Sequence, residues 1–165
     1  AEHVAIESVG PGEVLVIDAR GNTGAGVFGD RLVARMVFRG AEGMVTDGAM
    51  RDIPYLRGQE FPVFIKAPHG YGHTVEHWAM DHQLPISCGN VLIYPGDLIH
   101  GDRNGVTTIP AAIASQVAHV CKEFMEAEDI VLNYVRSESP TPKGMAQARE
   151  ACGQKIAELR DRVLS

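Results

Sequence analysis

The fold of this chain is decided between Gly29 and Asp52, where the sequence reads Gly29-Asp-Arg-Leu-Val-Ala-Arg-Met-Val-Phe-Arg-Gly-Ala-Glu-Gly-Met-Val-Thr-Asp-Gly-Ala-Met-Arg51-Asp52. Apolar residues recur in it at helical spacing, which predicts an amphipathic helix. They are Leu32, Val33, Met36 and Val37. Asp30 can cap the first turn, and Gly40 stands where a helix of about ten residues would end. Residues 43–47 then predict a short strand, after which Gly48 permits a sharp turn.

Two binding devices lie close together in this stretch. The first is the helix N-terminus at residues 29–32, where unpaired amides and the helix dipole favour a bound carboxylate or phosphate. The second is the Arg51-Asp52 pair, in which a forked donor adjoins a hard oxygen ligand suited to Mg²⁺ or Mn²⁺. An anion and a metal ion can therefore share one ligand here. The alternative is that Arg51 and Asp52 form an ordinary surface salt bridge.

A strand and a glycine-rich loop precede the helix. Residues 14–18 predict a fully buried strand that ends in a carboxylate. In the loop, Gly24, Gly26 and Gly29 match the spacing of the nucleotide-binding pattern Gly-x-Gly-x-x-Gly. No acidic residue closes the following strand at the distance that a ribose contact needs, unless Asp47 serves. We therefore favour an anion site without a nucleotide.

Length and composition exclude several classes of protein. The chain has 165 residues, of which 45% are hydrophobic and 22% are charged, and this is typical of one globular domain. A net charge of −6 without a lysine or arginine cluster argues against a nucleic-acid partner. No apolar run approaches the ~20 residues that cross a bilayer, so we expect no membrane partner. Because Cys88, Cys121 and Cys152 are odd in number and widely spaced, we expect no disulfide framework and a cytoplasmic location.

The rest of the chain predicts hairpins followed by helices. Short β-prone runs occur at residues 63–66, 86–88, 91–94, 98–100 and 106–109. Turn residues separate the last four, which predicts antiparallel pairs and hence an α/β fold with mixed sheets. Apolar stripes predict one long helix or two abutting helices over residues 111–137 and another helix over residues 143–164. We therefore expect an α/β domain over residues 1–110, with residues 111–165 forming helices that pack on it or on a neighbouring subunit.

Histidines cluster in the segment between Pro68 and Gln83. They are His69, His73, His77 and His82. Residues 73–77 match the zinc-hydrolase pattern His-x-x-Glu-His. A zinc site of that kind needs a stable helix and a further acidic ligand, whereas Gly70 and Gly72 interrupt the approach to this one. We favour the alternative, in which the histidines lie on a solvated loop or at a subunit contact.

Two ordered motifs carry a family resemblance. The first contains Gly-Asp-x-Leu at residues 29–32 and Arg-Gly-x-x-Gly-x-Val-x-Asp-Gly-x-x-Arg-Asp at residues 39–52. The second is Pro-Gly-Asp-Leu-Ile-His-Gly-Asp-x-Asn-Gly-Val at residues 95–106. In this order and spacing the motifs resemble the RraA-like family, which includes the 4-hydroxy-4-methyl-2-oxoglutarate aldolases. The resemblance spans about Pro11 to Pro110.

The resemblance implies a fold, an assembly and a chemistry. The fold is a β/β/α sandwich of the swivelling type, here with a C-terminal helical extension, and the subunits form homotrimers or homohexamers. The activity is that of a class II aldolase or decarboxylase, which cleaves a 4-hydroxy-2-oxo acid or oxaloacetate and releases pyruvate. Asp52 then holds Mg²⁺ or Mn²⁺, and Arg51 contacts the 2-oxo acid and acts in catalysis. The backbone of Gly29, Asp30, Arg31 and Leu32 holds the substrate carboxylate, and Asp30 can also orient a catalytic water.

Some consequences of the resemblance stay open. Family enzymes use an acidic residue from a neighbouring subunit's C-terminal region, for which Glu126, Glu128 and Asp129 are candidates; the two glutamates are otherwise expected on a solvated helix face. Arg31 stands where the family usually has an apolar residue, and Phe28 replaces a common Trp, which leaves the natural substrate undecided. The alternative function is a non-catalytic regulator, because some members are described as inhibitors of RNase E that act by protein contact.

Overall fold

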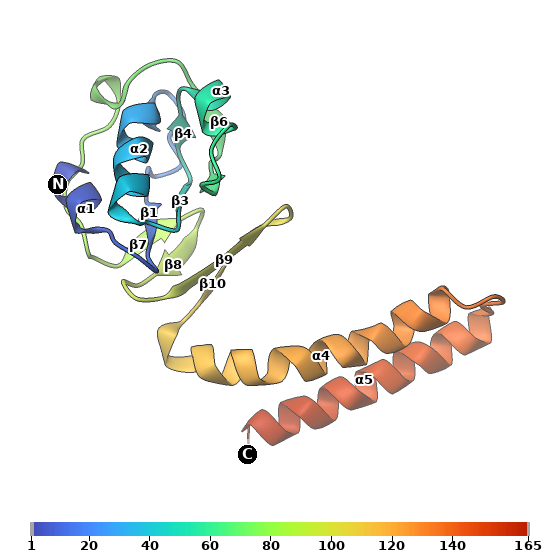
Figure 1. Ribbon diagram of the computed structural model, residues 1–165. Helices are drawn as coiled ribbons and strands as arrows, with labels where there is room; N and C mark the ends of the chain where they lie inside the picture. The colour runs from blue at the N-terminus through green and yellow to red at the C-terminus, as the bar shows by residue number, and fades with distance from the viewer. Residues whose placement is uncertain (1, 165) are drawn as a thin grey trace. The chain divides into compact units, whose positions relative to one another are not determined.

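The structure is a computed structural model that describes residues 2–164, and the chain divides into two compact units, residues 1–110 and residues 111–165 (Figure 1). The first unit combines short parallel strands, two hairpins and helices. Its helices are α1 (Glu2–Ser8), α2 (Asp30–Arg39), α3 (Ile53–Leu56) and the short 3-10 helix η1 (His73–Val75). Its strands are β1 (Val14–Ile17), β2 (Gly26–Phe28), β3 (Gly43–Thr46), β4 (Ala49–Met50), β5 (Val63–Phe64), β6 (Ala67–Pro68), β7 (Ile86–Cys88), β8 (Val91–Ile93), β9 (Leu98–Asp102) and β10 (Gly105–Ile109).

The first sheet has the order β1-β3-β5, and its strands are parallel. Val14 of β1 lies opposite Gly43 of β3, and Ile17 lies opposite Thr46. All four residues of the central strand β3 are buried, whereas all four residues of β1 are only half-buried. The prediction of a fully buried strand at residues 14–18 is therefore wrong in its burial. The reason is that β1 lies at the edge of the sheet and also lines a cavity.

The second sheet has the order β2-β4-β6 and is also parallel. Strand β2 forms inside the glycine-rich loop, so Gly26 lies in a strand opposite Ala49. Gly24 precedes this strand and Gly26 lies within it, so the Gly-x-Gly-x-x-Gly spacing does not follow a strand as a dinucleotide site requires. The single strand predicted at residues 63–66 is also corrected, because β5 pairs with β3 of the first sheet whereas β6 pairs with β4 of the second.

Helix α2 covers the core of the first unit and, in Figure 1, runs beside β3 and β4. Val33 and Met36 of this helix are fully buried together with Met44 and Met50 from the strands, and full burial of each such side chain contributes about 1.5–3 kcal/mol. Gly40 ends the helix as predicted, with a left-handed φ of 87°. Val37 is 44% exposed, so the buried stripe is narrower than the sequence predicts.

The predicted antiparallel half consists of two separate hairpins, β7–β8 and β9–β10. At the tip of the first, Gly89 and Asn90 both have positive φ, 60° and 64°, as a two-residue turn between twisted strands requires. Cys88 and Ile93 from this hairpin are buried with Val45 in a small second core cluster. The fold is thus of the predicted α/β type, but the prediction of mixed sheets is wrong, because the parallel strands and the antiparallel hairpins form separate sheets.

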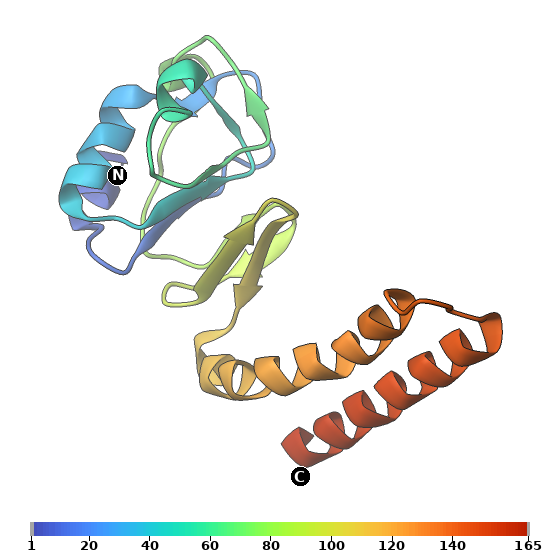
Figure 2. The ribbon, with the colours of Figure 1, turned by 45° about the vertical axis from the view of Figure 1, so that its right-hand side comes forward.

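The second unit is a helical pair. It comprises the 3-10 helix η2 (Ala111–Ile113) and the helices α4 (Ala114–Val135) and α5 (Pro142–Leu164). Figure 2 shows α4 and α5 antiparallel and side by side. Between them Ala127, Ala148 and Leu159 are buried, and Pro142 occupies the first helical position of α5, where its missing N–H costs nothing. Within residues 2–164 no helix has both the length and the apolar character needed to cross a bilayer.

Candidate functional site

Asp52 has an unusual backbone conformation that aims its side chain at the start of α2. It is a non-glycine residue in the left-handed region, with φ 61° and ψ 31°, immediately before α3. Such conformations store strain and concentrate at functional sites, although Asp tolerates them better than most residues. Its Oδ2 accepts a hydrogen bond of 3.1 Å from the backbone amide of Asp30, the first residue of α2. A carboxylate that is 22 residues away in the chain therefore satisfies an orphan amide of the helix N-terminus.

Gly29 makes this close approach possible. Its φ of −144° is ordinary extended backbone, so the glycine is not required for its conformation. A Cβ at this position would overlap the Oδ2 of Asp52 and lie only 2.6 Å from the Nε of Arg51. The glycine therefore leaves room for the two charged side chains against the first turn of the helix.

Arg51 is fixed at its backbone and partly open at its side chain. Its amide donates to the carbonyl of Phe28 at 3.1 Å, which continues the pairing of β4 with β2. Its Nε lies 3.5 Å from Asp52 Oδ2, and the two side chains are 40% and 38% exposed. An ion pair this exposed contributes little to stability. It does leave a guanidinium and a carboxylate side by side where a small ligand can reach both.

The structure brings residues 29–32 together with residues 51 and 52. Gly29 is the N-cap of α2, and the Oδ1 of Asp30 accepts a 2.7 Å hydrogen bond from the amide of Arg31. Arg31 is exposed, whereas Leu32 is half-buried against the core. The sequence suggested Asp30 as the cap of this turn. The residue that satisfies the first helical amide is instead Asp52, which no local pattern around Gly29 could reveal. The roles assigned to these residues in binding and catalysis stay predictions.

The donor set at this site is compatible with a hard divalent ion whose coordination is completed by oxygens of the substrate. Within residues 2–164 no group of three histidine, cysteine, aspartate or glutamate side chains is arranged to hold a metal ion. Mg²⁺ does not require such a group, since it commonly keeps several waters and binds one or two carboxylates together with oxygens of its substrate. Asp52 is a carboxylate of this kind, beside a helix start that favours the anion to be chelated.

The histidine-rich segment, which the sequence predicts on a solvated loop or at a subunit contact, borders the site. The amide of His69 donates to the carbonyl of Met50 at 2.9 Å, and the carbonyl of Tyr71 accepts from the amide of Gly26 at 2.8 Å. Further along, a ring nitrogen of His77 lies 3.1 Å from the carbonyl oxygen of Ala25. The segment is therefore attached to the strands that carry Arg51. The four histidines and their flanking glycines were the available signal, but nothing in their spacing indicated what they contact.

The His-x-x-Glu-His pattern does not form a zinc-binding helix. Only residues 73–75 are helical, as a single 3-10 turn. A helix that presents both histidines on one face would need to continue through His77. The side chain of Glu76 lies within hydrogen-bonding distance of Asn22, at 3.4 Å. These contacts attach the segment to residues 22–25, which is a structural role.

Asp47 connects loops that lie far apart in the sequence. Its Oδ1 accepts from the amide of Ala19 at 2.8 Å, and its Oδ2 accepts from the amides of Gly21 at 2.9 Å and Gly89 at 3.2 Å. These bonds hold the glycine-rich loop and the tip of the β7–β8 hairpin at the end of β3. Asp47 therefore has a structural role here, and not that of a ribose ligand.

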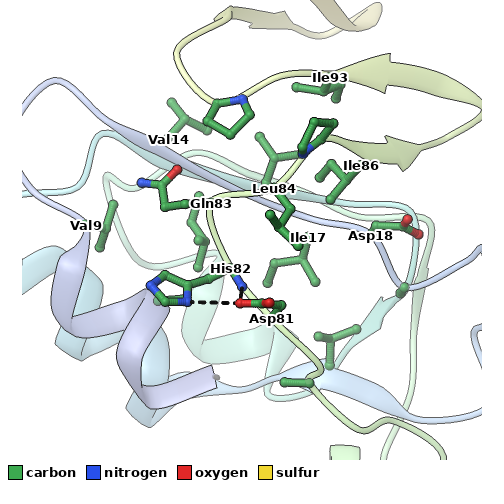
Figure 3. Close-up of a pocket in the computed structure, with 18 of the residues that line it drawn as sticks. Val9, Val14, Ile17, Asp18, Asp81, His82, Gln83, Leu84, Ile86 and Ile93 are labelled. Atoms are coloured by element: carbon green, nitrogen blue, oxygen red, sulfur yellow. Dashed lines mark hydrogen bonds and ion pairs between the residues drawn. The ribbon is translucent and has the colours of Figure 1, made fainter.

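A cavity of about 1070 Å³ lies elsewhere in the first unit. Its walls come from α1, β1, residues 76–86 and the turn between β8 and β9. Figure 3 shows apolar side chains of its lining, among them Val14, Ile17 and Leu84, together with polar ones that include Asp81 and its neighbour His82. None of residues 29–32, 51 and 52 lines this cavity, so the Arg51-Asp52 site is separate from it.

Comparisons with known proteins point to one family, although the matched proteins carry different functional descriptions. The family profile for RraA-like proteins, described as Aldolase/RraA, matches residues 1–108. A relative from Halalkalibacterium halodurans carries the provisional name 4-hydroxy-4-methyl-2-oxoglutarate aldolase, and it is 37% identical over 129 residues. The solved structure of RraAS2 from Streptomyces coelicolor, described as an unusual member of the RNase ES inhibitor RraA protein family, has a TM-score of 0.74 at 31% identity. An uncharacterized protein from Pseudomonas syringae has a TM-score of 0.77 at 26% identity.

The extent of these matches differs between the chains. The matched region is 76% of this chain but 59% of the Halalkalibacterium relative. The match to RraAS2 covers 78% of this chain and 66% of RraAS2. The match to the Pseudomonas protein covers 87% of this chain and 70% of that protein. The matched residues of the family profile include the whole stretch from Gly29 to Asp52. With this match over residues 1–108, the chain belongs to the RraA-like family.

Proposed function

We propose that this protein is a divalent-metal-dependent lyase that cleaves a carbon–carbon bond of a 4-hydroxy-2-oxo acid or of oxaloacetate and releases pyruvate. The observation that carries the proposal is the contact between Asp52, Arg51 and the start of α2, which are brought together from separate parts of the chain. A short 2-oxo acid has a carboxylate next to a ketone, and these are the two groups that such a site can bind. The aldolase name of the Halalkalibacterium relative agrees with this chemistry.

Each residue has a role that follows from its chemistry. Asp52 would hold Mg²⁺ or Mn²⁺, and the bound ion supplies positive charge that stabilises an oxyanion. Arg51 donates hydrogen bonds to the 2-oxo acid in the planar geometry that suits carboxylate and carbonyl oxygens. The first turn of α2, residues 29–32, binds the substrate carboxylate. The side chain of Asp30, at the same turn, orients a water for proton transfer.

Substrate binding has to exchange hydrogen bonds that already exist at this turn. The amide of Asp30 donates to Asp52, and the amide of Arg31 donates to the side chain of Asp30. A substrate carboxylate that takes over one of these amides would release the aspartate oxygen that the amide held. We infer that binding of the substrate and exposure of the Asp52 carboxylate are coupled for this reason.

We also propose a homotrimer or homohexamer. A pair of helices cannot bury a core by itself, so the second unit needs a further apolar surface to pack on. Several large apolar side chains of α4 are exposed, including Phe124, Met125, Leu132 and Val135. Glu126, Glu128 and Asp129 are exposed on the same helix. They remain candidates for an acidic residue donated to a neighbouring site. Light scattering on the purified protein measures the assembly directly.

A screen of 2-oxo acids with Mg²⁺ or Mn²⁺, read out as pyruvate released above the rate without protein, tests the lyase. We expect Asp52→Asn to lower the rate on the order of 100-fold, the usual cost of losing a group that stabilises transition-state charge. Asparagine tolerates the left-handed backbone, so the fold should survive the change. Asp161→Asn is the matched control, because Asp161 is an exposed residue of α5. Equal rates for Asp52→Asn and the control would end the proposal.

A non-catalytic regulator is the second candidate, and the description of RraAS2 as belonging to the family of RNase ES inhibitors favours it. In that case the purified protein inhibits an RNase E-type endonuclease through protein contact. Inhibition that persists in Asp52→Asn, together with no pyruvate release from any 2-oxo acid, would select this candidate over the lyase.

A further inference from the structure

The segment of residues 69–77 is attached at both ends, at its start next to Arg51 and at its end to the loop before β2. At its start, His69 extends the pairing of β6 along β4 by donating to the carbonyl of Met50, the residue before Arg51. At its end, Glu76 and His77 contact the loop before β2 through the side chain of Asn22 and the carbonyl of Ala25. The backbone between these two anchors therefore has a defined path, although the segment is rich in glycine.

That path brings Gly72 against the guanidinium of Arg51. A Cβ at Gly72 would lie 3.4 Å from the Nη1 of Arg51. The opposite part of the same side chain, its Cγ and Nε, packs on Gly29, where a Cβ would lie 2.9 Å and 2.6 Å away. The side chain of Arg51 thus lies beside two glycines, one from the start of α2 and one from the 69–77 segment. A Cβ at Gly29 would force a shift, whereas a Cβ at Gly72 would just make ordinary contact, so only a side chain that branches beyond Cβ can press on the guanidinium there.

We propose that the 69–77 segment positions the guanidinium of Arg51 for the 2-oxo acid, with Gly72 as the positioning residue. The proposal rests on the lyase function proposed above and adds a residue to it. An arginine donates two parallel hydrogen bonds only when its planar group has the right orientation. Arg51 is 40% exposed, and its ion pair with Asp52 is long, at 3.5 Å. A Cβ at Gly72 would just reach the Nη1 of this side chain, so the 69–77 segment runs close beside the end of the guanidinium that Asp52 does not hold.

Gly70 offers a matched control within the same segment. A Cβ at Gly70 would meet no atom within 4 Å, whereas one at Gly72 meets Arg51. Gly72 has φ −76° and ψ 159°, a conformation that any residue adopts. Gly70→Val and Gly72→Val therefore add the same side chain two residues apart, and they differ in whether that side chain contacts Arg51.

The kinetic arm of the test is the KM for the active 2-oxo acid. A misplacement of about 1 Å at a reacting site can cost on the order of 100-fold, so we expect Gly72→Val to raise KM by about tenfold or more, with a smaller change in kcat. Gly70→Val should stay within about twofold of the unchanged protein in both constants. If Gly72→Val does not fold, Gly72→Thr, which also branches beyond the Cβ that just reaches Nη1, should raise KM in the same direction.

The second arm does not depend on turnover. The Nε–Hε signals of the arginines are recorded by nitrogen-15 NMR, and the signal of Arg51 is assigned by its loss in Arg51→Lys. Gly72→Val should move this signal, and Gly70→Val should leave it in place. An unmoved Arg51 signal in Gly72→Val, or a moved signal without a rise in KM, would overturn the proposal. A protein that releases no pyruvate from any 2-oxo acid refutes the lyase itself, while the NMR comparison still shows whether Gly72 positions Arg51.

Discussion

Gly29→Ala should damage the site more than it damages the fold. The new Cβ would overlap Asp52 Oδ2 and stand 2.6 Å from Arg51 Nε, whereas ordinary contacts of a Cβ begin at 3.4 Å. Relief of the overlap with Arg51 alone therefore needs a shift of about 0.8 Å. Shifts of this size in a reacting group can cost on the order of 100-fold in rate. We expect kcat/KM for pyruvate release to fall by at least about tenfold.

The expected loss of stability in Gly29→Ala is smaller. Forcing an extra methyl group into a packed position costs about 1–3 kcal/mol. The φ of −144° suits alanine, and both charged side chains are partly exposed, so they can move into solvent. We therefore expect a loss near the lower end of that range, about 1 kcal/mol, measured by urea unfolding.

Gly58→Ala is the control for this prediction. A Cβ at Gly58 would meet its nearest neighbour, the carbonyl oxygen of Tyr55, at 3.4 Å, which is close to ordinary contact. This variant should keep the activity of the unchanged protein. If Gly29→Ala keeps full activity and full stability, the argument that Gly29 exists to admit Arg51 and Asp52 is refuted. A loss of activity that only mirrors global unfolding would also contradict it.

Two further predictions concern residues outside the site. Asp47→Ala removes a carboxylate that accepts hydrogen bonds from three backbone amides. Because bonds to charged groups contribute about 1.5–3 kcal/mol each and the site is partly exposed, we expect the free energy of unfolding, measured in urea, to fall by about 2–3 kcal/mol. An unchanged unfolding midpoint would contradict this structural role. Burial raises the pKa of the Cys88 thiol to about 11, so at pH 8 the native thiol stays protonated and should resist iodoacetamide, whereas the exposed Cys121 should react. Mass spectrometry of the alkylated peptides measures both, and equal labelling of the two cysteines in the native protein would refute the second prediction.

Helices and hairpins whose determining residues lie close together in the chain could be predicted from the sequence. Helix α2 follows from apolar residues three and four positions apart and from Gly40, which ends it in a left-handed conformation. The β7–β8 hairpin follows from the Gly89-Asn90 turn, and α4 and α5 follow from their apolar stripes and from Pro142. In each case the residues that determine the element lie within a few positions of one another, so one window of sequence contains the whole cause.

Contacts between distant segments were decided only by the tertiary structure. The sequence predicted Asp52 as a metal ligand and suggested Asp30 as the cap, whereas Asp52 is the residue that binds the first amide of α2. It likewise did not show that β2 forms within the glycine loop, that residues 63–68 divide between two sheets, or that Gly72 lies beside Arg51. The physical reason is that the lateral order of parallel strands depends on how they pack together, and no periodicity within one strand records its neighbours.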